Sequence, residues 1–198
     1  MLFRSGTPNV YLTGNAAAGV TRTCANGSGS GGSSANAISA YVMAGAGAVN
    51  FGGHYNTIDY TGNGTGTFSG NSTNAVAITL YGDFLLKSGM PTFSQTQIVS
   101  FNSASSIQNI TTNGVLFLVP IRIGISSSTN IVRLQDDLTS STSRSLTLFC
   151  GTLDLNGKKL TIGSFVNAGD LTRSISYNSG TLVLNGSGTV MDASGSGY

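Results

Sequence analysis

The sequence RSLTLFCGTLDLNG, from Arg144 to Gly157, is followed by a close copy, RSISYNSGTLVLNG, from Arg173 to Gly186. Each copy has an arginine, a run of alternating polar and apolar residues, a glycine, and a second alternating run that ends in Asn-Gly. Alternation with a period of two is typical of a β-strand with one buried side, and Gly and Asn-Gly are turn residues. The chain therefore repeats a strand–turn–strand unit at an interval of 29 residues.

Two more stretches have this form: ITLYGDFLLKSG, from Ile78 to Gly89, and, less closely, ITTNGVLFLVP, from Ile110 to Pro120. The four central glycines lie about 32, 37 and 29 residues apart, which is within the range of stacked repeats. Each interval has room for about three short strands, or one rung of a β-solenoid. We predict that the glycines supply the turns at the corners: Gly82, Gly114, Gly151 and Gly180. Arg144 and Arg173 are then expected to recur at one corner, where they cap a turn or line a solvent edge.

Stacking explains why the unit is repeated. One rung cannot bury its own apolar side, whereas stacked rungs bury a continuous core and pair their backbones. The leucines of TLDLNG share one side of their strand, as do those of TLVLNG, so stacking is expected to place leucine over leucine. The predicted core residues are Leu146, Leu148, Leu153, Leu155, Leu160, Ile162, Leu182 and Leu184. On this prediction Leu155→Asp prevents folding or assembly, while Asp154→Ala has little effect.

The composition independently indicates an all-β protein. Gly, Ser, Thr and Asn supply about half of the 198 residues, and the chain has no Trp and no Glu. β-Branched and aromatic residues favour strands, and Gly and Asn favour the turns between them. A β-sandwich also has many short strands at regular spacing and is the alternative to the parallel, β-helix-like solenoid. The internal repeat favours the solenoid.

The charges and hydropathy argue against two classes of partner. Charged residues make up only 8% of the chain, and the nine basic ones are scattered, with only Lys158 and Lys159 adjacent. Nucleic-acid binding needs a dense basic patch, so no nucleic-acid partner is expected. No apolar run reaches about 18 residues, so no membrane insertion is expected. The first twelve residues, MLFRSGTPNVYL, lack the apolar stretch of a signal peptide.

Residues 1–36 differ from the rest and are predicted to form an extended N-terminal arm and a Gly/Ser-rich linker, followed by a repetitive β domain over 37–198. The arm, with NVYLTG as one strand, would pack on a neighbouring subunit, and the alternative is a disordered terminus. The last residues end in the repeat pattern without a cap, so further chain or another subunit is expected to cover them. Cys24 and Cys150 are expected to be separate buried thiols, with a single long-range bridge as the alternative.

The sequence contains no recognisable catalytic, metal or cofactor motif. His54 is the only histidine, and without Glu no HExxH site can form, so His54 is expected to lie in a turn. Paired carboxylates can cleave a glycoside, and stacking of the rungs would place Asp154, on the polar side of its strand, near Asp83. The aromatic and basic residues that accompany such pairs are scarce. We therefore expect no enzyme activity, no cofactor and no metal. The remaining carboxylates are Asp59, Asp136, Asp137, Asp170 and Asp192.

Residues 45–195 resemble a group of repetitive β-rich proteins encoded by tailed bacteriophages and environmental viruses. The resemblance rests on SGM (88–90), ITTNG (110–114), LQDDLT (134–139), RSLTL (144–148), GTLDLNGKKLTIGSF (151–165) and GTLVLNGSGTV (180–190). Members of this group look like virion-surface or tail-fibre components. The resemblance implies a structural or receptor-contacting role and carries over no catalytic residue.

These observations together predict a structural virion protein of a bacteriophage, as a subunit of a fibre, a spike or a capsid decoration. It would act at the virion surface by self-assembly, with trimerisation natural for a fibre, and would contact other virion proteins and a host-surface glycan. One alternative is a subunit of an extracellular cell-surface filament or adhesin. A second alternative is a solenoid enzyme that degrades polysaccharide.

Overall fold

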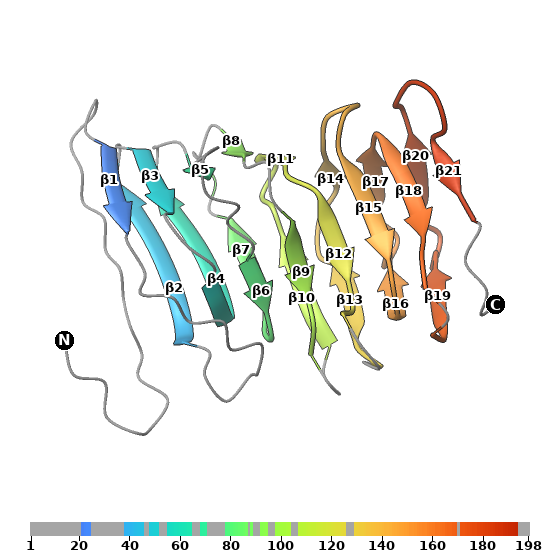
Figure 1. Ribbon diagram of the computed structural model, residues 1–198, viewed down its shortest axis with the longest axis horizontal. Coiled ribbons are helices and arrows are strands. Elements are labelled where there is room, and N and C mark those ends of the chain that lie inside the picture. The colour runs from blue at the N-terminus through green and yellow to red at the C-terminus, as the bar shows by residue number, and fades with distance from the viewer. Residues whose placement is uncertain are drawn as a thin grey trace.

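The computed structural model of the chain describes the backbone of five strands before residue 71, and then residues 78–193 except 87, 89–91, 95–97, 104–106, 126–128 and 170. Within these described residues every regular element is a β-strand, and none is a helix. The strands wind into long ladders, and every pairing in them is parallel (Figure 1). Parallel ladders built from one winding chain define a β-solenoid, so the alternative of an antiparallel β-sandwich is wrong.

The ladders form three faces of the solenoid. The first face contains the first half of β4 (Tyr55–Gly64), then β6 (Ile78–Leu80), β9 (Val99–Phe101), β12 (Ile121–Ile123), β15 (Ser145–Leu148), β18 (Ser164–Asn167) and β21 (Met191–Asp192). The second face contains β2 (Ile38–Gly45), the second half of β4, then β7 (Phe84–Leu86), β10 (Ile107–Thr111), β13 (Ile131–Leu134), β16 (Gly151–Asp154) and β19 (Arg173–Ser176). Because β4 spans both faces, the two ladders join there into one sheet, and β2 pairs along most of β4.

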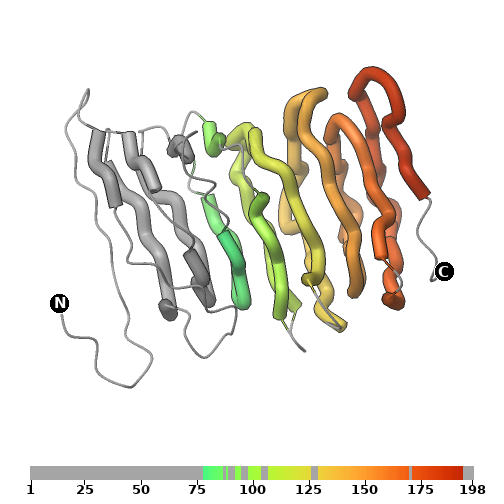
Figure 2. The backbone as a smooth tube through the Cα atoms, viewed as in Figure 1, coloured from blue at the N-terminus to red at the C-terminus, as the bar shows by residue number. Residues whose placement is uncertain are grey.

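The third face contains two ladders. The first consists of β1 (Thr21–Cys24), β3 (Ala48–Phe51), β5 (Phe68–Gly70), β8 (Thr92–Ser94) and β11 (Leu116–Leu118), and the second of β14 (Leu138–Thr139), β17 (Lys159–Ile162) and β20 (Thr181–Leu184), with no strand pairing between β11 and β14. Three consecutive strands, one on each face, make one rung. Rungs 1 to 5 are β6–β8, β9–β11, β12–β14, β15–β17 and β18–β20, and β21 begins another. Figure 2 shows these turns following one another along the axis.

The register gives a shorter repeat than the sequence predicted. Equivalent positions on the first face are Ile78, Val99, Ile121, Leu146, Phe165 and Met191, so one turn takes 19–26 residues. The interval of 29 residues between the two copies is therefore one turn plus one strand. RSLTLFCGTLDLNG forms β15 and β16 on the first and second faces, whereas RSISYNSGTLVLNG forms β19 and β20 on the second and third.

This offset corrects the predicted stacking. Leu153 lies between Val132 and Ile175, not beside Leu182. Leu182 pairs in register with Leu160, and Leu184 with Ile162. Arg144 and Arg173 likewise lie at different corners, since Arg144 precedes β15 on the first face and Arg173 begins β19 on the second. The two copies have similar sequences although they lie on different faces, so a strand and its corner can have the same local pattern on either face.

The predicted turn glycines lie alternately at two different corners. Gly82 and Gly151 separate the first face from the second, and Gly114 and Gly180 separate the second from the third. Gly114 and Gly151 have positive φ angles of 77° and 83°. Gly180 does not need a positive φ, and is required because a Cβ there would lie 2.6 Å from the Lys158 carbonyl oxygen. At that corner the positive φ angles belong to Asn178 and Ser179.

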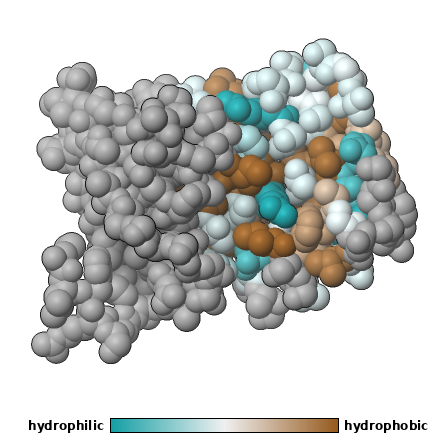
Figure 3. All heavy atoms as spheres, in the orientation of Figure 1, coloured by the Kyte–Doolittle hydropathy of each residue, from teal (hydrophilic) through white to brown (hydrophobic). Residues whose placement is uncertain are grey.

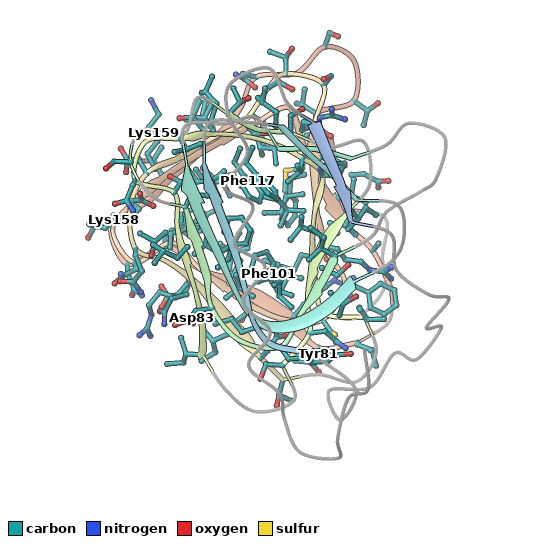
Figure 4. The ribbon with its side chains drawn as sticks, turned by 90° about the vertical axis from the view of Figure 1, so that its left-hand side faces the viewer. Tyr81, Asp83, Phe101, Phe117, Lys158 and Lys159 are labelled. Atoms are coloured by element: carbon teal, nitrogen blue, oxygen red, sulfur yellow. The ribbon has the colours of Figure 1, made fainter. Side chains whose placement is uncertain are left out.

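The core fills the space between the three faces (Figure 4). In rungs 1 and 2 it is aromatic: the rings of Phe84 and Phe93 pack edge to face with centroids 5.2 Å apart, and Phe117 stacks on Phe93 at 5.3 Å. Phe101 lies in edge contact with Phe84. In rungs 3 to 5 the core is aliphatic except for Phe165, in β18. The phenylalanines of rungs 1 and 2 were absent from the predicted core, although each lies in a short segment in which polar and apolar residues alternate as in a strand.

Residues 1–36 contain one described element, β1, which pairs in parallel with β3 in the same ladder as the later strands. The NVYLTG segment, the Gly/Ser-rich segment and His54 lie outside the described residues. Cys150 is buried at the corner after β15, and the side chain of Cys24 lies outside the described residues.

Candidate functional site

Four of the described aspartates join adjacent rungs through side-chain hydrogen bonds, and we call Asp83, Asp136, Asp137 and Asp154 the inter-rung carboxylates. Asp83 of rung 1 accepts hydrogen bonds from the backbone N–H of Asn109 at 2.7 Å and from its side-chain amide at 3.1 Å. Gln135 in rung 3 donates to the Asn109 Oδ1 in turn, at 2.5 Å. This polar row therefore runs across three rungs on the outside of the second face.

The corner between the second and third faces is closed by two more of these carboxylates. Asp136 of rung 3 accepts from the backbone N–H groups of Thr112 and Asn113 and from the Thr112 hydroxyl, which are in rung 2. Asp137 accepts from the backbone N–H of Lys159, in rung 4, at 2.8 Å. The two adjacent carboxylates thus contact different rungs, since Asp136 bonds to the preceding rung and Asp137 to the following one.

Asp154 is the most buried of the four and contacts both neighbouring rungs. Its Oδ2 pairs with Arg133 Nε of rung 3 at 2.8 Å, and its Oδ1 accepts from Asn178 Nδ2 of rung 5 at 2.8 Å and from the Asn156 backbone N–H at 2.9 Å. The Asp154 side chain is 6% exposed, and that of Arg133 is 34% exposed. Burial alone raises the pKa of Asp154, but the three hydrogen bonds and the charge of Arg133 outweigh it, and the pKa lies below its usual value.

These contacts bear on the carboxylate pair considered for glycoside cleavage. Asp83 and Asp154 do not stack, since they lie in rungs 1 and 4 and are bonded to different partners. Within the described ranges no group of three or more His, Cys, Asp or Glu side chains could hold a metal ion. The side chains of Asp59 and Asp170 lie outside the described residues.

A buried amide network was missed by the sequence analysis. Gln108 is fully buried, donates to the carbonyl oxygens of Leu80 and Gly82 at 3.0 and 2.8 Å, and accepts from the Ser103 N–H. Asn130, also fully buried, donates to Gln108 Oε1 at 3.1 Å. Buried amides that are hydrogen-bonded to backbone carbonyls fix the register of successive rungs. The only sequence signal was a Gln and an Asn beside strand ends, which is common in loops.

The cations on the surface are held separately from one another. The Arg122 guanidinium carbon lies 4.6 Å from the centroid of the Phe149 ring, and Arg173 fastens the turn before β19 by donating to Asn167 and to the Leu171 carbonyl. Lys158 and Lys159 project outward from the corner before β17, on the same side of the solenoid as Asp83 (Figure 4). Directly after β6, burial raises the pKa of the Tyr81 hydroxyl.

The predicted core residues are divided between the interior and the end of the solenoid. Six of them are at most 2% exposed: Leu146, Leu148, Leu153, Leu155, Leu160 and Ile162. Leu182 and Leu184, in rung 5, are only partly buried and pack against this core together with Ile175. Beyond them Met191 is 58% exposed and Tyr177 is 49% exposed.

Rung 5 and β21, which we call the open rung, form the candidate interaction site. Among the described strands, β21, β19 and β20 are each the last in their ladder, so one edge of each has no strand paired to it there. The same rung carries the partly buried side chains of Ile175, Leu182 and Leu184. An unpaired strand edge with apolar side chains beside it is a template for addition of another strand.

Comparison with protein families, curated proteins and solved structures finds no match for this chain. Within the part of the chain that the structure describes, no helix is long and apolar enough to cross a membrane. In the coloured part of the face seen in Figure 3, hydrophilic and hydrophobic residues lie interspersed.

Proposed function

We propose that this protein is a structural subunit of a bacteriophage virion, as part of a fibre, a spike or a capsid decoration, and that it acts by self-assembly at the virion surface. The observation that carries the proposal is the open rung, where the ladders of the described strands end beside partly buried Ile175, Leu182 and Leu184. A surface of this kind is stabilised when another β-rung covers it. Other virion proteins and a host glycan are the further partners.

Two other observations support a structural role. The inter-rung carboxylates are engaged in contacts between rungs, which gives these acidic groups a part in stability. The parallel ladders of the first and second faces also run the length of the described solenoid, while that of the third face is interrupted between β11 and β14, so hydrogen-bonded rungs follow one another as a rod (Figure 1). A rod with hydroxyl and amide groups on its outside is suited to a fibre or spike that meets solvent and glycan. The resemblance to phage surface proteins supplies the virion part of the proposal.

The test is to locate the protein in its native source. Antibody raised against residues 78–193 would be used to label particles for electron microscopy, with an antibody to a capsid protein as the reference label. Label on a capsid, tail or fibre is the expected result. Label on free filaments or on a cell envelope would overturn the virion proposal and favour a cell-surface filament or adhesin. Turnover of a polysaccharide that is lost in an aspartate variant would instead favour the enzyme.

A further inference from the structure

The first face of the solenoid differs from the second in its charges. The four inter-rung carboxylates lie on the second face or at its corners, where they are bonded to neighbouring rungs. By contrast, the first-face strands of rungs 1 to 5, together with the residues directly flanking them, contain no acidic residue. Their charged residues are Arg122, in β12, and Arg144, directly before β15. This stretch of the first face therefore carries positive charge only.

Arg122 lies in the middle of this face, and its guanidinium is held in place by an aromatic ring. The guanidinium carbon lies 4.6 Å from the centroid of the Phe149 ring, which belongs to the next rung. A Cβ on Gly169 would lie 3.0 Å from the same ring, so Phe149 is itself packed against rung 5. Because the fixed ring limits the rotamers open to Arg122, less side-chain entropy is lost when the guanidinium binds a ligand.

The guanidinium of Arg122 has no partner among the described residues. Its Nε is buried, yet no described residue accepts a hydrogen bond from it, and no described carboxylate is paired with the side chain. A buried donor without an acceptor costs free energy, so an anion that reached this nitrogen would be bound more tightly. The residue as a whole is only half-buried, so part of its side chain is open to solvent. A carboxylate or a sulfate suits a guanidinium because it can accept two parallel hydrogen bonds.

Hydroxyl groups lie beside Arg122 on both neighbouring strands. Ser100 and Thr147 are its in-register partners in β9 and β15, and neighbouring strands lie about 4.8 Å apart. These residues alternate with buried core residues, so their side chains are on the outer side of the face. Thr147 is the more accessible of the two, because Ser100 is only 7% exposed. A hydroxyl both donates and accepts hydrogen bonds, as contact with a sugar hydroxyl requires.

We infer that the first face binds an acidic glycan, with Arg122 holding a carboxylate or sulfate group of the glycan and Thr147 bonded to a hydroxyl of the same sugar. Phe149 is a positioning residue, since it acts through the guanidinium that it holds. The inference deepens the proposed function and rests on its glycan part, but it does not depend on the virion. An acidic peptide would offer a carboxylate without the sugar hydroxyls, and the experiments below distinguish it.

The first experiment measures binding to three oligosaccharides of equal length by saturation-transfer NMR, in which only the ligand signals are observed. The probes are an oligomer of galacturonic acid, which carries carboxylates, a sulfated galactose oligomer and a neutral galactose oligomer. At least one acidic oligomer should bind, and the neutral one should bind at least about tenfold more weakly. The two acidic probes show whether the group is a carboxylate or a sulfate. Equal binding of the neutral oligomer, or binding of neither acidic one, would overturn the inference.

The second experiment locates the site with two variants that each remove one positive charge. Arg122→Gln should raise the Kd for the acidic oligomer at least about tenfold. Lys159→Gln should bind like the wild type, because Lys159 is exposed at the start of β17. Figure 4 shows it across the solenoid from Tyr81, which directly follows the first-face strand β6. Equal weakening by both variants would mean that binding follows the net charge, and would reject the site.

Arg122→Lys keeps the test valid if Arg122→Gln proves unstable in a thermal melt. It retains the charge but loses the planar fork that binds two oxygens, so it should still weaken binding of the acidic oligomer. Full binding by a folded Arg122→Lys chain would show that the guanidinium does not make the contact.

The third experiment separates a glycan from an acidic peptide. Thr147→Val removes one hydroxyl and keeps the shape of the side chain, so it should weaken the acidic oligosaccharide about threefold and leave a polyglutamate peptide unaffected. Polyglutamate that bound at Arg122 as tightly as the oligosaccharide would reject the glycan. Binding of an acidic oligosaccharide by a protein that is absent from virions would reject only the virion proposal. Label on virions without such binding would reject only this inference.

Discussion

Asp154 is the residue whose role the structure changes most. Its position on the polar side of a strand predicted that its removal would have little effect, but it lies almost fully shielded between Arg133 of one rung and Asn178 of another. The sequence could not indicate this, because the partners are 21 and 24 positions away and the length of a rung was not known.

We therefore expect Asp154→Asn to lower the free energy of unfolding by about 2 kcal/mol, the usual value for loss of a hydrogen-bonded charge that is shielded from water. Urea unfolding followed by circular dichroism measures this. Thr152→Ala is the matched control, since its hydroxyl bonds only to Ser174 on the exposed side of the same strand. An Asp154 variant no less stable than the control would contradict the role given to these contacts.

Asp154 also makes stability depend on pH. Because its pKa is lowered by folding, the unfolded chain binds its proton more readily, and stability rises with pH. The contribution is complete above the ordinary value of 3.8 and is lost as the pH falls through the lower pKa of the folded state. The difference in unfolding free energy between the wild type and Asp154→Asn should thus be larger at neutral pH than at about pH 3. A difference that did not change with pH would show that the carboxylate is not ionised in its contacts.

Comparison of Gly124 with Gly114 separates two costs of adding a Cβ, the strain of a positive φ and a steric clash. Both have positive φ, 74° and 77°, but a Cβ on Gly124 would lie 2.1 Å from the Cys150 sulfur, whereas a Cβ on Gly114 meets nothing within 4 Å. Gly114→Ala should cost about 1 kcal/mol, the backbone term alone. Gly124→Ala should cost clearly more, because Cys150 must move. Thermal unfolding of the two variants distinguishes them, and equal effects would mean that the corner near Cys150 can relax.

At the scale of the element, the strand–turn–strand unit was predictable and its place in the rung was not. Alternation and glycines indicated strands, turns and stacking, and most of the proposed leucines do lie in the interior. The sequence could not show that the second copy lies one face further on than the first, because β15–β16 and β19–β20 have similar sequences at different corners. Strand length and turn type are local properties, whereas the face on which a strand lies depends on how many strands precede it.

Leu155 provides the test for this scale. It is fully buried at the end of β16, where its backbone N–H bonds to Ser176 of the next rung. Leu155→Asp should abolish the cooperative unfolding transition. An unpaired charge in the core lowers the free energy of unfolding by more than the few kcal/mol that are lost in most point variants. Thr161→Asp, on the outer side of the neighbouring strand, should remain folded. A Leu155→Asp chain with a normal transition would mean that this part of the core is misassigned.

At the scale of the whole molecule, protection should vary along the axis. Rungs 2 to 4 are covered on both sides, whereas the outward backbone groups of Ile175, Leu182 and Leu184 are at the open edge. Amide hydrogen exchange should therefore be slowest in rungs 2 to 4 and faster at these three residues, since exchange follows local opening. Exchange at these three residues that was as slow as in β12 or β13 would show instead that this edge is covered.

The relation between the two copies has a consequence for how such a chain can lengthen. Since the same strand–turn–strand sequence of 14 residues recurs after 29 residues on a different pair of faces, this unit is not tied to one face of the solenoid. We therefore expect that inserting or removing one strand with its corner would move the downstream strands to the next face. The length of such a chain could then change in steps smaller than a complete turn.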